Sequence, residues 1–221
     1  MTIEIVTNLI ILLTSQIGFI YGFFTILIRR QPLYLKMVVL VMACMMVSRI
    51  YVILQFITKG DDPDVFHVGM LGMLGCFLFL FSANFGMIDS LTDDGDKEFI
   101  KYRIISWLAP VLIIAGFVPV CFFGGTISKN VSYAVVVLFV ALASRYHLKH
   151  LIFPDVDYGV VRCIRGYNAV ALVLCLAVTV FISGDILSLD IMMLISGIVI
   201  SICCIVIVPL IKKEASKWTT A

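Results

Sequence analysis

The sequence predicts an all-α membrane protein, a seven-transmembrane-helix bundle with its N-terminus outside and its C-terminus in the cytoplasm. Three observations support this prediction: an apolar composition, apolar runs of spanning length, and an asymmetric distribution of basic residues. The 221-residue chain is 62% hydrophobic and 14% charged, whereas soluble domains have about 45–50% apolar and about 25% charged residues. The composition therefore excludes an ordinary soluble protein.

Seven apolar runs account for the predicted helices in chain order. A hydrocarbon core of roughly 30 Å needs about 20 helical residues to cross it, and five runs of that order carry no Asp, Glu, Lys or Arg. The second run is interrupted only by Arg49. The fifth reaches spanning length only if its helix continues past Arg145 and Lys149, with both side chains extending their charges to the interface. The predicted spans, which form a single transmembrane domain over 1–221, are approximately 5–28, 37–58, 68–90, 104–126, 131–152, 166–184 and 190–211.

Basic residues give the orientation, because Lys and Arg concentrate in cytoplasmic loops. Seven spans leave Lys59 and Lys129 outside and Arg49 within the membrane. If residues 131–152 did not span, six basic residues would lie inside and nine outside, which reverses the rule, so we reject the six-span alternative. In the seven-span arrangement the other 13 of the 16 Lys and Arg lie on the cytoplasmic side: Arg29, Arg30, Lys36, Lys97, Lys101, Arg103, Arg145, Lys149, Arg162, Arg165, Lys212, Lys213 and Lys217.

The segments between the spans are short, and none of them can bury a core of its own. The longest are residues 58–67, 93–103 and 153–165. We therefore expect any ligand site within the bundle or at its mouths, and any signal has to pass to a membrane or cytoplasmic protein partner. The expected location is the plasma membrane, with the lipid bilayer as partner and no bound cofactor. A net charge of +2 gives no bias toward nucleic acid.

Arg49 is the most costly residue for a membrane helix. It lies thirteen residues after Lys36, which places it roughly 20 Å from the cytoplasmic edge at ~1.5 Å per residue. A central Arg costs about 2.5–3.5 kcal/mol on insertion scales, so an inward-facing functional residue is the default interpretation. The alternatives are snorkelling toward the outer surface or a structural salt bridge. Glu4, Asp185 and Asp190 are the acidic candidates for such a bridge.

Other polar residues share this region of the predicted bundle. Ser48, Tyr51 and Gln55 follow the spacing of one helix face, and Gln16 lies near the middle of the first span. We predict an outward-opening polar pocket that these residues line, with Arg49 facing an anionic ligand group. The alternative for Gln16 is a hydrogen bond between helices.

Acidic and imidazole groups cluster where the third and fifth spans reach the cytoplasm. Such a cluster could hold a divalent metal that activates a lipid phosphate. However, Lys149 stands between His147 and His150, and a nearby positive charge opposes metal binding. We therefore predict a solvated acidic loop and no metal site. The residues concerned are Asn84, Asp89, Asp93, Asp94, Asp96 and Glu98 near the third span, and His147, His150, Asp155 and Asp157 near the fifth.

Asp89 has a second interpretation, as one half of a switch. It lies where the third span meets the cytoplasm, and Arg162 and Arg165 lie where the sixth span begins. A charge pair between two helix ends can hold a bundle closed and break when the helices move. We predict such an ion pair, which requires the third and sixth spans to be neighbours.

Three classes of function remain after two exclusions. A retinal pigment is excluded because residues 190–211 lack the lysine that a Schiff base needs. Intramembrane haem is excluded because its histidine ligands would have to lie within the spans, whereas His67, His147 and His150 are expected at or beyond the interfaces. The favoured class is a receptor-like or regulatory bundle that senses a small ligand from the outer side and acts through a partner protein. The alternatives are a small-solute transporter and a membrane enzyme with an Asp/His site at the cytoplasmic face. We favour a protein without enzymatic activity.

Overall fold

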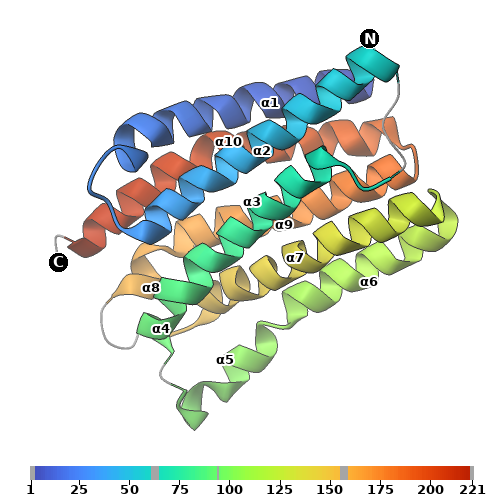
Figure 1. The fold of residues 1–221 in the computed structure, drawn as a ribbon. Helices are drawn as coiled ribbons and strands as arrows, with labels where there is room; N and C mark the ends of the chain where they lie inside the picture. The colour runs from blue at the N-terminus through green and yellow to red at the C-terminus, as the bar shows by residue number, and fades with distance from the viewer. Residues whose placement is uncertain (1–2, 61–64, 94, 155–158, 220–221) are drawn as a thin grey trace.

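The computed structural model describes residues 3–60, 65–93, 95–154 and 159–219, and it confirms the predicted seven-helix bundle (Figure 1). The fold is 88% helical, and the described residues contain no strand. Within them, seven helical segments are long and apolar enough to cross a membrane. The two termini lie at opposite ends of the bundle, which we call the N-terminal end and the C-terminal end. Which end faces the cytoplasm stays a prediction.

Each span consists of one long helix or of a helix extended by shorter turns. The fourth span is the most divided, because a 3-10 turn and two helices follow one another within it. In chain order the elements are α1 (Ile3–Gly22), the π-helical turn η1 (Phe23–Leu27), α2 (Leu33–Lys59), α3 (Val68–Ala83), the π-helical turn η2 (Asn84–Ile88), α4 (Asp89–Thr92), the 3-10 turn η3 (Lys97–Phe99), α5 (Ile100–Ile105), α6 (Leu108–Phe123), α7 (Ile127–Ile152), α8 (Val160–Cys163), α9 (Arg165–Ile186) and α10 (Asp190–Thr219).

Local signals explain where the helices begin and end. α2 stops at Lys59 because Gly60 takes a φ of 84°, a left-handed conformation that ends helices and suits glycine. α7 begins after Thr126, whose side chain accepts a hydrogen bond from the Lys129 N–H at 3.2 Å. This N-cap satisfies one of the unpaired amide groups of the first turn. The helix then runs through Arg145 to Ile152, so the weakest predicted span is present in full.

Six of the spans form a closed ring. Each helix packs against two neighbours in the order α1, α2, α3, α7, α9, α10 and back to α1. α6 lies outside this ring and packs mainly against α7 (Figure 1). The core fills the middle of the ring with large side chains such as Met42, Met45, Phe77 and Tyr167, all of them fully buried. The ring order decides which polar groups can meet at either end.

α2 and α3 approach closely because Gly72 carries no side chain. A Cβ at this position would lie 2.8 Å from the backbone nitrogen of Ser48 and 2.9 Å from the carbonyl oxygen of Cys44. Small residues allow such contacts between helix backbones in lipid, where close packing drives association. The contact fixes α3 against the turn of α2 that carries Arg49.

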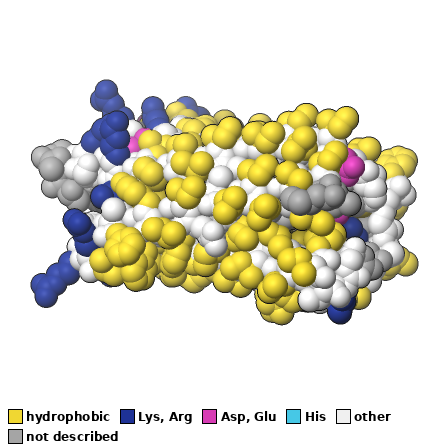
Figure 2. Space-filling model, turned by 90° about the horizontal axis from the view of Figure 1, so that it is seen from above, with side chains coloured by type: hydrophobic (Ala, Val, Ile, Leu, Met, Phe, Trp, Pro, Cys, Tyr) yellow, Lys and Arg dark blue, Asp and Glu magenta, His cyan; other side chains and the backbone are white. Residues whose placement is uncertain are grey.

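The outer surface is apolar along the bundle and basic at one end. Figure 2 shows hydrophobic side chains along the length of the molecule and Lys and Arg side chains gathered at the left, which is the C-terminal end in Figure 1. Helices of alternating direction bring the loops and helix ends that carry the 13 basic residues to that end. An apolar girdle with a basic end is the pattern that a bilayer selects.

Candidate functional site

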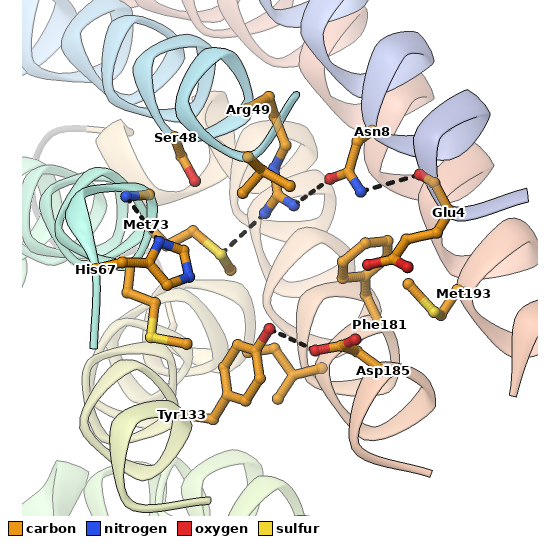
Figure 3. Close-up of a pocket in the computed structure, with 14 residues that line it drawn as sticks. Glu4, Asn8, Ser48, Arg49, His67, Met73, Tyr133, Phe181, Asp185 and Met193 are labelled. Carbon is orange, nitrogen blue, oxygen red and sulfur yellow. Dashed lines mark hydrogen bonds between the residues drawn. The ribbon is translucent and has the colours of Figure 1, made fainter. Parts of the chain in front are cut away.

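Arg49 is buried in the bundle, with 3% of its surface exposed. One guanidinium nitrogen donates to the side-chain oxygen of Asn8 at 2.7 Å, and another contacts the sulfur of Met73 at 2.9 Å (Figure 3). The guanidinium carbon also lies 5.2 Å from the ring centre of Phe181. Asn8 in turn donates to the backbone oxygen of Glu4 at 3.0 Å. Side chains from three other helices, α1, α3 and α9, therefore hold the arginine in one orientation.

Arg49 belongs to a small pocket at the N-terminal end, between all six helices of the ring (Figure 3). The pocket volume of about 20 Å³ exceeds the roughly 10–15 Å³ that one water molecule requires. Three methionines form part of its wall. The lining residues are Glu4, Asn8, Ser48, Arg49, Val52, His67, Gly69, Met70, Met73, Tyr133, Phe181, Ile182, Asp185 and Met193.

Asp185 places a buried carboxylate in the same pocket. Its oxygens accept a hydrogen bond from the Tyr133 hydroxyl at 2.6 Å and contact the ammonium group of Lys129 at 3.1 Å. Asp185 was one of the acidic residues considered as a partner for Arg49. These two bonds direct its carboxylate toward α7, where the charge of Lys129 balances it, and they keep it apart from Arg49.

His67 also lines the pocket and was not predicted as a site residue. Its ring nitrogen Nδ1 accepts the Gly69 N–H at 3.1 Å and caps the start of α3. The ring stacks on Tyr51 with centres 5.2 Å apart. Burial and then the positive charge of Arg49 lower the pKa of His67 to about 4, so the imidazole is neutral at physiological pH. Its place directly before an apolar run is the only signal of this role in the sequence.

The predicted site residues divide into two groups. Ser48 and Arg49 line the pocket, and the buried Ser48 hydroxyl has no hydrogen-bond partner among the described residues. Tyr51 contributes indirectly, through its stack on His67. Gln55 and Gln16 are not among the lining residues. Gln16 lies eight residues beyond Asn8 on α1, about 12 Å along the helix at ~1.5 Å per residue.

A second polar cluster lies at the C-terminal end, where α4 meets the last turns of α7. The ammonium group of Lys149 contacts Asp89 at 2.5 Å and Asp93 at 2.6 Å. His150 contacts Asp89 at 3.1 Å through Nε2, and Arg103 makes a bidentate contact with Asp93. Two carboxylates therefore share three cationic or imidazole partners, a balanced arrangement that holds α4 and α5 against α7.

This cluster corrects the predicted partners of Asp89. Arg162 and Arg165 are exposed, and Arg165 contacts the backbone oxygen of Phe153 at 3.4 Å. Among the described residues no ion pair joins either arginine to Asp89, whose partners are Lys149 and His150. The physical reason is the ring order, because α7 lies between α3 and α9 and its last turn reaches Asp89 first.

The expectation of a solvated acidic loop is also wrong for part of this segment. The side chain of Asp93 is 7% exposed, and the hydrogen bonds from Arg103 lower its pKa well below the usual range. Asp96 and Glu98 are exposed as expected, while Asp94, Asp155 and Asp157 lie outside the described residues. Within the described part of the chain no group of three or more His, Cys, Asp or Glu residues is arranged to hold a metal ion.

A third polar cluster is buried between η2, α7 and α9. The Asn84 amide nitrogen lies 2.8 Å from His147 Nδ1 and donates to Asn168 Oδ1 at 2.7 Å, and the His147 and Asn168 atoms are 2.9 Å apart. All three side chains are fully buried. His147 and His150 were expected at the interface, but both are enclosed by the bundle. Neither Asn84 nor Asn168 has a periodic signal that would reveal the contact.

The apolar spans, the closed ring and the polar groups enclosed at its two ends are those of a multi-pass integral membrane bundle. Comparison of the chain with known protein families, with curated proteins and with solved structures finds no match.

Proposed function

We propose that this protein is a receptor-like or regulatory bundle that binds a small ligand with an anionic group at Arg49. The observation that carries the proposal is the position of this arginine, buried in a pocket to which six helices contribute. Buried ionisable residues within spans are costly and are by default functional. A ligand bound there contacts every helix of the ring at once.

The donor geometry favours a carboxylate or a phosphate. A guanidinium group presents five N–H donors in a planar fork that matches the oxygens of such groups. The Met73 sulfur is a weak acceptor, and an anionic oxygen would replace it at Arg49 with a stronger, charge-assisted bond. Asp185 and Glu4 also line the pocket, and they would suit a positive group on the same ligand.

Ligand binding requires the pocket to widen, because the present volume accommodates about one water molecule. Met70, Met73 and Met193 line it, and unbranched methionine side chains rearrange readily. Such a movement would shift α2 and α3 against α9 and α10. Since the loops are too short to bury a core, we propose that a membrane or cytoplasmic partner detects the shift.

The test measures the thermal unfolding midpoint of the purified protein against a panel of small carboxylates and phosphates. We expect a member of the panel to raise the midpoint of the wild type and of the matched control Lys59→Gln, which removes an exposed charge at the same end. Arg49→Gln should abolish the rise and Arg49→Lys should reduce it, because lysine keeps the charge without the fork.

Two outcomes would contradict the proposal. One is an equal rise in folded Arg49→Gln and wild type, which would place the ligand elsewhere. The other is uptake of the stabilising compound into proteoliposomes, which would assign a transporter. The buried Asn84, His147 and Asn168 cluster is the feature that favours transport as the alternative, because polar groups inside a bundle often mark solute or proton paths.

A further inference from the structure

A polar cleft lies at the C-terminal end, far from Arg49. It is bounded by α1, α2 and α10 and has a volume of about 320 Å³, compared with about 20 Å³ for the Arg49 pocket. Tyr21, Tyr34 and Pro209 form part of its wall, and Lys212 and Lys213 are its charged lining residues. The function proposed above uses none of these groups.

The cleft is more basic than the local sequence indicates. Glu214 follows the two lysines directly, but its side chain turns toward α9, where it accepts the Tyr167 N–H at 2.9 Å. Glu214 is 8% exposed and is not among the residues that line the cleft. α10 thus separates its charges. The Glu214 carboxylate lies at the start of α9, and the ammonium groups of Lys212 and Lys213 are available to the cleft.

The walls combine this charge with apolar surface. The ammonium group of Lys212 lies 5.4 Å from the ring centre of Tyr21, a residue that is 38% exposed. Leu35, Tyr34 and Pro209 provide the inner wall. A cleft with an apolar wall and a basic rim at the end of membrane spans matches a lipid, whose phosphate can meet the lysines while its glycerol and acyl chain follow the helices.

We propose that this cleft binds the headgroup of an anionic phospholipid. The charge asymmetry predicts that the C-terminal end faces the cytoplasm, where the leaflet carries anionic lipids and where basic pockets between spans bind their headgroups. A free phosphate ion would use the lysines but gain nothing from the apolar wall. The occupant that we propose is therefore a lipid, and the charge of the two lysines selects an anionic headgroup.

The experiment is native mass spectrometry of the full chain taken from micelles that contain phosphatidylcholine and phosphatidylglycerol in equal amounts. We expect the wild type to retain phosphatidylglycerol in preference to phosphatidylcholine. Lys212→Gln/Lys213→Gln should lower that retention on the order of tenfold, and Lys212→Arg/Lys213→Arg should preserve it. The matched control is Lys97→Gln/Lys101→Gln, which removes two exposed charges at the same end outside the cleft.

If the double variant does not fold, Lys213→Gln alone replaces it in the test. This variant should fold because Lys213 is exposed, and it should still reduce the retention of phosphatidylglycerol severalfold. Equal retention by the wild type and the folded Gln variants would overturn the proposal. An equal loss in the Lys97 and Lys101 control would show unspecific surface charge and would overturn it as well. Displacement of the lipid by inorganic phosphate would assign the site to a free ion.

Discussion

Arg49 shows which properties of a single residue can be predicted from the sequence and which cannot. A charge inside an apolar run is conspicuous, so its burial and inward direction could be predicted from cost alone. Its partners could not. Asn8 and Gln16 are both polar residues of the first span, and only the depth and rotation of α1 decide that Asn8 meets Arg49 at 2.7 Å. The sequence interpretation named Gln16, whereas Asn8 is the amide of the first span that contacts Arg49 in the structure.

The free energy of unfolding should depend on pH through His67. Its pKa is about 4 in the folded protein, against 6.5 for an ordinary histidine. Between these values the unfolded chain binds a proton that the folded chain does not, so His67 lowers stability as the pH falls from about 6.5 to 4 and contributes no slope above that range. His67→Asn retains a capping side chain and should remove this part of the pH dependence.

The measurement is the unfolding free energy of wild type and His67→Asn across that range. The difference in slope should approach at most about 1.4 kcal/mol per pH unit. His67→Asn also loses the stack on Tyr51, which should shift the free energy of unfolding by the same amount at every pH. Parallel curves for the two proteins would show that the buried imidazole does not titrate as the structure requires.

At the scale of elements, the position of α3 against α2 depends on Gly72. Replacement by alanine would place a methyl group 2.8 Å from the Ser48 backbone nitrogen, and backbone atoms cannot move aside as a flexible side chain can. We expect Gly72→Ala to cost about 1–3 kcal/mol through overpacking. It should also weaken any ligand bound at Arg49, since Ser48 and Arg49 lie on the displaced turn.

Gly116→Ala is the matched control for this substitution. A Cβ at Gly116 on α6 meets no heavy atom within 4 Å, and alanine favours a helix interior by roughly 1 kcal/mol over glycine. Thermal unfolding of both variants should therefore shift in opposite directions. A stable Gly72→Ala protein with wild-type unfolding would contradict the close contact between α2 and α3.

The helices themselves could be predicted, because each depends on a local apolar run and on caps such as Gly60 and Thr126. Their neighbours could not, because periodicity in one helix does not say which other helix it faces. Asp89 illustrates the difference. Its place at the end of the third span was predicted, but α7 rather than α9 supplies its partners, Lys149 and His150.

The whole molecule has two chemically distinct ends. The N-terminal end encloses the narrow pocket around Arg49. The C-terminal end carries most of the basic residues, the Asp89 and Asp93 cluster and the cleft that Lys212 and Lys213 line. Because 13 of the 16 Lys and Arg belong to loops and helix ends on one side of the bundle, we expect that end to face the cytoplasm. The Arg49 pocket would then face outward.

Impermeant maleimide labelling tests this orientation. Lys59→Cys and Lys101→Cys place thiols at exposed positions of opposite ends, and the wild type with its seven native cysteines provides the background. We expect Lys59→Cys to react in intact cells and Lys101→Cys only after permeabilisation. The reverse pattern would invert the molecule and place the Arg49 pocket in the cytoplasm.

The place of α6 outside the ring has a practical consequence. A closed circle of helices has no free edge, so a displacement of α2 on ligand binding has to be shared among its other members. α6 rests mainly on α7, with a smaller contact on α9, and has no comparable contact with α2 or α10. A fluorophore attached to its outward face, for example at Val118, would thus serve as a fixed reference against which the motion of α2 or α10 could be measured.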